Sequence, residues 1–446
     1  MANKGINRAS NVRRIVLSGY YGFHNSGDEA VLKSILTALD EAGTAAGLKI
    51  EPIVLSGDPE WTRRHYGVEA VPRMDLREVR RALKNSDGLI SGGGSLLQDA
   101  TGMGSIPYYL GIMAIARWCG KPTFVYAQGI GPVNRKLFQP FIARAFKKAA
   151  YVSVRDEESA LLLRRYGVPE AKVEVVPDPV MGLPAGSAGV EEQEARGAVG
   201  QEHGMMAGAA EGQEHGAIAG AEPAAIGGGV AGRDEPPIVE AGVAGGQEQW
   251  ASAVAEPSAA GGGVAGRDEP PIVGVSVRFW RSDRADLDRA AAALEALAAR
   301  APRGVRLRFL PFHQGGDEGA SRYVMERLSC AAELAPAHED PQRMLREVGR
   351  CALLIGMRLH SLIYAANREV PLLGISYDPK IDQFLARLSQ RAIGTTEALD
   401  PDNAADRALE IINNPAQWLA ACGPAVSRLK REAIKPAQQI VDYLRI

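Results

Sequence analysis

The residues of this chain best suited to do chemistry lie within positions 356–361, which read Gly-Met-Arg-Leu-His-Ser. Arg358 and His360 stand there two positions apart, after an apolar run and at the start of a helical pattern over 359–367. A helix start presents free backbone N–H groups and partial positive charge. An arginine fork and a titratable imidazole at such a start suit a small polyanion that must be held and protonated, and we expect Leu359 between them to bind it too.

Three further candidates follow predicted strands elsewhere in the chain, and they are Arg155, His313 and Lys380. Since ligands of parallel sheets gather at the carboxyl ends of the strands, these side chains can meet Arg358 and His360 in one place. Three cations and an imidazole there match an anion that carries both carboxylate and phosphate. The sequence also leaves open a purely structural explanation, in which Arg358 caps a neighbouring carbonyl and His360 packs in the turn.

A carboxylate, Asp28, stands at the start of a helix predicted at 29–42, behind a glycine-bearing loop. It could cap this helix, or it could orient or deprotonate a substrate hydroxyl, and the sequence leaves both open. We expect Asn25 in the same loop to contact substrate. We expect the same of Gly93 and Gly94, because successive glycines let the backbone wrap a ligand or a neighbouring loop. Their run is neither a P-loop nor a dinucleotide fingerprint, so nucleotide hydrolysis is not predicted.

Strand and helix patterns alternate on both sides of a central segment and must position these residues. They predict an α/β fold of two Rossmann-like domains that face each other across a cleft. We expect the first domain at 12–182 and the second at 272–425. The tail, 426–446, is expected to form a C-terminal helix that packs back on the first domain.

The central segment, 183–271, differs in composition from the rest of the chain. It is rich in glycine, alanine, glutamate and glutamine, and the stretch 227–239 recurs letter for letter at 261–273. A repeat of this fidelity without an apolar period cannot bury a core, so the segment is predicted to be a disordered insertion. The residues suggest no role for it.

Composition narrows the class of protein. The chain has 446 residues, 46% of them hydrophobic and 23% charged, and a formal net charge of −2, which gives no hint of a nucleic-acid partner. Four dispersed cysteines without a CxxC pair indicate free thiols of a reducing compartment, and neither a metal site nor a cofactor is expected. Without an apolar leader or span, the protein is expected to be cytoplasmic. The oligomeric state and contact with a membrane surface are left open.

Six stretches taken together resemble the polysaccharide pyruvyl transferases, and are most similar to the bacterial enzyme of this family that acts on the secondary cell-wall polysaccharide. They span the chain outside the insertion, and they are 19–29, 92–99, 128–132, 152–156, 356–361 and 374–380. Each stretch is weak evidence alone, but their combination and order are specific.

The resemblance implies a glycosyltransferase-B type fold and phosphoenolpyruvate as donor. It also implies a 4,6-linked pyruvate ketal on N-acetylmannosamine of a lipid-linked acceptor, a step that serves S-layer anchoring, at the inner face of the plasma membrane. It assigns donor binding and catalysis to Arg155, Arg358, His360 and Lys380. We predict His360 as the general acid, with His313 as its rival. Two alternatives are a nucleotide-sugar-dependent glycosyltransferase of the same fold and a non-catalytic sugar- or nucleotide-binding protein.

Overall fold

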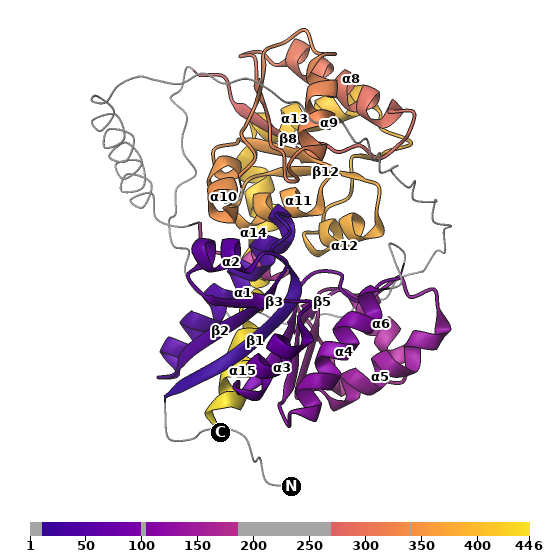
Figure 1. Ribbon diagram of the computed structural model, residues 1–446. Coiled ribbons are helices and arrows are strands. Elements are labelled where there is room, and N and C mark those ends of the chain that lie inside the picture. The colour runs from indigo at the N-terminus through magenta and orange to yellow at the C-terminus, as the bar shows by residue number, and fades with distance from the viewer. Residues whose placement is uncertain (1–10, 100–103, 186–268, 339) are drawn as a thin grey trace, which may run out of the picture. The chain divides into compact units, whose positions relative to one another are not determined.

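The computed structural model describes residues 11–99, 104–185, 269–338 and 340–446. The predicted insertion therefore lies outside the described residues except at its two ends, 183–185 and 269–271. The described chain forms two α/β halves, each built on its own parallel sheet (Figure 1).

The N-terminal half has a seven-stranded parallel sheet in the order β3-β2-β1-β4-β5-β6-β7. Its strands are β1 (Val12–Tyr21), β2 (Lys49–Ser56), β3 (Glu69–Pro72), β4 (Gly88–Gly92), β5 (Thr123–Gln128), β6 (Tyr151–Val154) and β7 (Glu174–Val175). Its helices are α1 (Ser26–Ala45), α2 (Pro59–Tyr66), α3 (Leu76–Lys84), α4 (Ser105–Trp118), α5 (Gln139–Lys148) and α6 (Glu157–Arg165), with the 3₁₀ turns η1 (Lys136–Phe138), η2 (Glu170–Lys172) and η3 (Pro179–Gly182).

The strand β1 shows why helices cover both faces of this sheet. Its Ile15, Val16 and Leu17 are all fully buried. Because successive strand side chains point to opposite faces, Ile15 and Leu17 pack in the core that includes α1, whereas Val16 packs in the core that includes α3 and α4. A strand buried on both faces has a continuous apolar sequence, which is the pattern that predicted it.

The C-terminal half has a six-stranded parallel sheet in the order β10-β9-β8-β11-β12-β13. Its strands are β8 (Ile272–Ser276), β9 (Arg306–Phe309), β10 (Ala332–Leu334), β11 (Leu353–Gly356), β12 (Leu372–Ser376) and β13 (Gly394–Thr395). Its helices are α8 (Ala285–Arg300), α9 (Gly316–Met325), α10 (Pro341–Gly349), α11 (Leu359–Asn367), α12 (Pro379–Arg387), α13 (Pro401–Asn413) and α14 (Pro415–Ala433). The last helix, α15 (Lys435–Arg445), packs against the N-terminal half.

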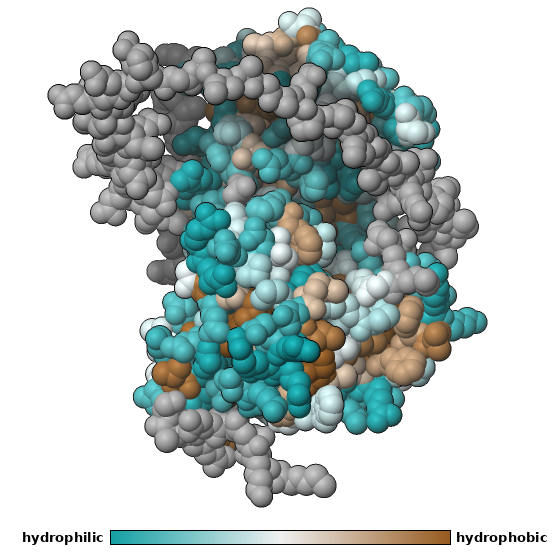
Figure 2. Space-filling model, viewed as in Figure 1, coloured by the Kyte–Doolittle hydropathy of each residue, from teal (hydrophilic) through white to brown (hydrophobic). Residues whose placement is uncertain are grey.

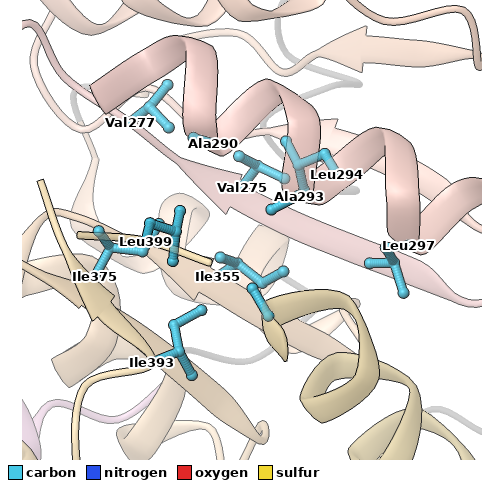
Figure 3. Close-up of a pocket in the computed structure, with 11 residues that line it drawn as sticks. Val275, Val277, Ala290, Ala293, Leu294, Leu297, Ile355, Ile375, Ile393 and Leu399 are labelled. Atoms are coloured by element: carbon cyan, nitrogen blue, oxygen red, sulfur yellow. The ribbon is translucent and has the colours of Figure 1, made fainter. Parts of the chain in front are cut away.

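The helix α8 shows how helices attach to the second sheet. Its Ala290, Leu294 and Leu297 recur at helical spacing on one face, which lies over the apolar side chains of the strands, including Val275 and Ile355 (Figure 3). The space left between them is only about 10 Å³, so this interface is packed core without room for a ligand. The predicted fold class, two Rossmann-like α/β units, is confirmed.

Several elements differ from the sequence expectation. Residues 57–58 form a bend, and α2, which the pattern did not predict, begins directly after it with Asp58 as its N-cap. The helix α9 begins at Gly316, with a first turn that is polar and gives no apolar period from which its start could be predicted. The strands β3, β10 and β13 and the helices α10, α13 and α14 had no counterpart in the pattern. The strands are short ones at sheet edges, which carry too weak a period to be found from one sequence.

Contacts between segments distant in sequence join the two halves. The Asn367 amide of α11 donates hydrogen bonds to the carbonyls of Val180, Met181 and Leu183, at 2.9, 3.1 and 2.9 Å. The last helix, α15, contacts α1, β5 and β6. There the buried Arg13 side chain of β1 donates to the Leu444 carbonyl at 2.9 Å. These contacts fix the carboxyl ends of the two sheets close enough to share a cavity.

The visible surface of the N-terminal half is largely hydrophilic, with apolar patches near α5 and α6 (Figure 2). Exposed apolar side chains on these helices include Phe141 and Leu161. Among the described helices, none combines the length and apolar character that a bilayer crossing requires.

Candidate active site

A cavity of about 140 Å³ opens at the carboxyl ends of both sheets. Its lining comes from the two halves and consists of Asn25, Gly27, Arg155, Phe312, His313, Arg358, Leu359, His360, Tyr377, Asp378, Lys380 and Ile381. The structure thus brings together the three cations and two histidines selected from the sequence, together with Leu359 and Asn25. The remaining candidates, Asp28, Gly93 and Gly94, do not line it.

His360 occupies the first turn of α11, between the two halves. Its Nε2 has no hydrogen-bond partner among the described residues and lies 3.9 Å from Oδ2 of Asp178. Burial lowers the pKa of His360, and the nearby Asp178 carboxylate acts in the opposite direction. An imidazole nitrogen that is buried and unpaired, on a side chain that lines a cavity, is available to a ligand.

The other edge of the His360 ring lies directly against the backbone of Gly27, at the start of α1. A Cβ added to Gly27 would come within 2.4 Å of His360 Nδ1, so no side chain fits there. This glycine therefore allows the N-terminus of α1 to approach the imidazole of the other half closely.

Arg155 reaches the cavity from the end of β6, and polar partners hold it in place. It donates to Ser95 Oγ at 2.8 Å and to Asp178 Oδ2 at 3.4 Å. A Cβ on Gly129 would lie 2.9 Å from its Nε, so this glycine leaves room for the guanidinium. The buried Asp178 thus stands between Arg155 and His360 and can orient both.

Arg358, the N-cap residue of α11, forms a two-pronged pair with the Asp317 carboxylate. Its Nε lies 3.1 Å from each Asp317 oxygen, and its NH2 group donates to Oδ1. The Asp317 side chain is 1% exposed and also accepts from the backbone N–H groups of Phe312 and His313, at 3.1 and 2.9 Å. Arg358 is therefore anchored by a buried carboxylate. The structural alternative had its side chain capping a neighbouring carbonyl, and no such contact is found among the described residues.

Lys380 adds a third cation from the start of α12. Asp378 caps this helix by accepting from the Lys380 backbone N–H at 2.9 Å. Among the described residues the Lys380 ammonium has no hydrogen-bond or ion-pair partner. Burial lowers its pKa, which marks a desolvated cation without a direct counterion. Such a group is ready to receive an anionic ligand.

Asp28 is not the cap of α1, because Asn25 takes that place, with its Oδ1 accepting from the Gly27 N–H at 3.1 Å. Burial raises the pKa of Asp28 to about 7, and the neighbouring Glu29 adds to the shift. Arg155 lowers the pKa of Asp28 and Asp178 raises it, so Asp28 lies within electrostatic range of both side chains. A carboxyl that titrates near neutral pH, beside the cavity, can act as a base.

Gly93 and Gly94 lie against the helix α1. Both adopt left-handed conformations, with φ of +60° and +71°. A Cβ on Gly93 would lie 1.9 Å from Val31 of α1, and one on Gly94 would lie 3.0 Å from Asp28 Oδ1. The glycine run therefore wraps the neighbouring helix and leaves space for Asp28, and neither glycine lines the cavity.

His313, the rival acid, is an exposed residue of the cavity rim. Its backbone pairs with Asn25 in an isolated antiparallel bridge between the two halves. Its backbone N–H is also fixed by Asp317, as described above. This arrangement gives His313 a structural part in closing the rim, and it leaves its ring on the solvent side.

Sequence reasoning missed Asp178 and Asp317, the carboxylates that hold the cations. Asp178 closes a predicted strand as part of Pro-Asp-Pro, and this position at a strand end was its only signal. Asp317 gave no signal, because it lies in the polar first turn of α9, where no apolar period marks a helix. Among the described residues, no group of three or more His, Cys, Asp or Glu side chains could hold a metal ion.

Comparison with known proteins identifies the class. Residues 25–229 and 253–379 match the family model of the polysaccharide pyruvyl transferases. The match covers most of the chain, so the chain belongs to the polysaccharide pyruvyl transferase family. It is therefore a transferase enzyme of polysaccharide biosynthesis. No curated protein sequence matches it.

Solved structures show the fold. The UDP-GlcNAc 2-epimerase of Neisseria meningitidis, bound to UDP-GlcNAc, aligns with a TM-score of 0.53 at 10% identity, over 97% of this chain and 99% of its own. The Anabaena protein HepE, in complex with UDP and glucose, aligns with a TM-score of 0.52 at 11% identity, over 97% and 99%. A putative UDP-N-acetylglucosamine 2-epimerase of Listeria monocytogenes aligns with a TM-score of 0.54 at 8% identity, over 97% of this chain and 95% of its own. The fold is of the glycosyltransferase-B type.

Proposed function

We propose that this enzyme transfers the enolpyruvyl carbon skeleton of phosphoenolpyruvate to two hydroxyls of a saccharide, forms a pyruvate ketal and releases phosphate. One observation carries the proposal: Arg155, Arg358 and Lys380 converge from separate elements on one cavity, with His360 against it. A small donor with a carboxylate and a phosphate matches this charge arrangement.

The two arginines are pre-organised for the donor. Each guanidinium is held by a buried carboxylate, Arg155 by Asp178 and Arg358 by Asp317. A guanidinium fixed in orientation can bind a carboxylate or a phosphate through two parallel hydrogen bonds. The Lys380 ammonium adds a point charge that gains a counterion only when an anion binds. The site therefore favours a polyanion over a neutral sugar.

The chemistry needs one acid and one base. His360 donates a proton to the methylene carbon of the donor, while an acceptor hydroxyl forms a C–O bond to the carbon that carries phosphate. Asp28 takes the proton of that hydroxyl. The second hydroxyl then bonds to the same carbon, the bond to the phosphate oxygen breaks, and the second hydroxyl proton leaves with phosphate. The proton gained by Asp28 restores His360, so the cycle balances.

The acceptor that we propose is an N-acetylmannosamine residue of a lipid-linked cell-wall precursor, modified at its 4- and 6-hydroxyls. Its support is the resemblance of the six sequence stretches to the secondary cell-wall enzyme. A lipid-linked acceptor would place the enzyme in the cytoplasm, in peripheral contact with the inner face of the plasma membrane.

Turnover of defined donors tests the function. Purified enzyme is incubated with methyl β-glycosides of N-acetylmannosamine, galactose and glucose, and with either phosphoenolpyruvate or UDP-sugars. We expect phosphate release and a ketal, visible by NMR as a new methyl singlet, only with phosphoenolpyruvate. Release of UDP from a UDP-sugar instead would show a nucleotide-sugar-dependent glycosyltransferase, the alternative that the fold permits.

The pairing of Arg358 with Asp317 leads to a prediction on donor binding. Asp317→Asn keeps the side-chain size but removes the charge and turns an NH₂ group toward a guanidinium. We expect the affinity for phosphoenolpyruvate to fall about tenfold to a hundredfold, since a charge-assisted contact contributes about 1.5–3 kcal/mol. Calorimetric titration measures this fall, and Asp288→Asn, an exposed carboxylate paired with Arg327, is the matched control. An unchanged donor affinity in Asp317→Asn would separate Arg358 from the donor.

A further inference from the structure

A pair of exposed aromatic rings, which we call the aromatic platform, lies at the end of β1. The rings of Tyr20 and Phe23 stack at a centroid distance of 4.1 Å and an interplanar angle of 10°. They are 42% and 41% exposed. Tyr21, which lies between them in sequence, is the ring that packs in the core. It is buried, and its hydroxyl donates to the Gly92 carbonyl at 2.9 Å. The platform is therefore not required to fill the interior.

Arg73, at the end of β3, holds the platform in place. Its guanidinium lies 5.2 Å from the ring centre of Phe23 and 4.5 Å from that of Tyr108. The same group donates to the Gly19 carbonyl and to the Tyr109 hydroxyl, both at 3.3 Å. Rings fixed by such contacts lose little conformational entropy when a ligand stacks on them.

The platform belongs to the same loop as the cavity. Phe23 precedes Asn25 by two residues, so their Cα atoms lie within about 8 Å. Asn25 and Gly27 line the cavity. The Tyr109 hydroxyl, which accepts from Arg73, lies in turn within electrostatic range of the Asp28 carboxylate. The aromatic rings, the proposed base and the cavity thus follow one another along a single loop and its neighbours.

We propose that Tyr20, Phe23 and Arg73 form the acceptor subsite, on which a pyranose ring stacks while its hydroxyls reach Asp28. The inference rests on the proposed function and names where the saccharide binds. The apolar C–H face of a pyranose fits an aromatic ring, and its hydroxyls suit the guanidinium and phenol groups at the edge. The donor cavity is lined with cations and offers no comparable exposed apolar ring on the N-terminal side.

A second exposed ring provides the rival surface in the C-terminal half. Trp280 is 42% exposed and packs on Tyr377, a residue of the cavity lining, at a centroid distance of 4.5 Å. Arg278 donates to the Tyr377 hydroxyl at 2.9 Å, so this group is likewise fixed. It lies on the opposite half from Asp28, and we therefore assign the acceptor to the aromatic platform.

The test compares four variants of the full chain with phosphoenolpyruvate and methyl β-N-acetylmannosaminide as substrates. Tyr20→Leu and Phe23→Leu remove one ring each, and Trp280→Leu removes the rival ring. Phe141→Leu is the control, because it removes an exposed ring that is remote in sequence from the site. We expect each platform variant to raise KM for the glycoside about tenfold and to leave calorimetric donor affinity within twofold. Saturation-transfer NMR on the glycoside should weaken in the same variants.

The outcomes separate this inference from the function on which it rests. Wild-type enzyme that turns over none of the three methyl glycosides with phosphoenolpyruvate would overturn the proposed function. Turnover with an unchanged glycoside KM in both platform variants would overturn the acceptor subsite alone. A rise of KM in Trp280→Leu instead would place the saccharide on the C-terminal half, which also contradicts the inference.

Discussion

His360→Ala is expected to bind phosphoenolpyruvate nearly as well as wild type but to turn it over about 10²–10⁴-fold more slowly, the scale of losing an acid–base group. The reason is that the His360 Nε2 is buried and unpaired beside the cavity. In the proposed mechanism the donor is bound by Arg155, Arg358 and Lys380, which line the cavity and which the substitution leaves in place. Phosphate release in the presence of acceptor gives turnover, and calorimetry gives donor affinity.

Two comparisons sharpen this experiment. His313→Ala should lose much less activity, because its ring lies on the exposed rim. Added imidazole should partly restore His360→Ala, because the truncation leaves a space of the size of the ring. Gly27, which has no side chain, does not fill that space. A variant that keeps wild-type turnover, or loses donor binding alone, would mean that another group donates the proton.

The site could be predicted from the sequence as far as it depends on strand ends. Arg155, Arg358 and Lys380 each follow a strand of a parallel sheet, and such positions meet at one edge. The helix carrying His360 was predicted at 359–367, which is the extent of α11, because Gly356 ends the strand and the apolar face is strong. The type and order of residues therefore indicated both the fold and the cluster of cations.

What the sequence could not supply is pairing across the chain. Arg358 and Asp317 are 41 positions apart and on different elements, so no local period connects them. The glycines illustrate the same limit. A run of three at 92–94 indicates close approach, and only the structure shows that Gly93 and Gly94 approach Val31 and Asp28 of α1. Gly27 likewise lies against His360 of the other half, a neighbour that its place in the sequence does not reveal.

The capping of α1 also needed the structure. Asp28 and Asn25 are both good helix caps, and only the geometry shows that Asn25 is the cap. This outcome releases Asp28 from a structural explanation. A carboxylate that is buried without capping its helix destabilises the folded chain when charged, and that cost is a measurable sign of a functional group.

Asp28→Asn should therefore combine a large loss of activity with a gain in stability. Turnover is expected to fall about 10²–10⁴-fold because the amide cannot accept the hydroxyl proton. The folded pKa of Asp28 is about 7, raised from 3.8 by burial. Between about pH 4 and pH 7 the native state keeps a proton that the unfolded chain loses, so wild-type stability falls as the pH rises through this window. Asparagine does not ionise and avoids that loss.

The variant should accordingly unfold at nearly the wild-type denaturant midpoint at pH 4. At pH 8 its free energy of unfolding should exceed that of wild type by on the order of 1–4 kcal/mol. Glu60→Gln, which changes an exposed carboxylate in the first turn of α2, is the matched control and should alter neither quantity. In wild type, kcat at saturating donor should show two limbs: a rise with pH near 7 or above, where Asp28 ionises, and a fall at higher pH, where His360 loses the proton that it must donate. The bound anion disfavours the Asp28 carboxylate and favours the His360 imidazolium. If Asp28→Asn kept wild-type turnover, or were no more stable at pH 8 than at pH 4 relative to wild type, Asp28 would not be the base.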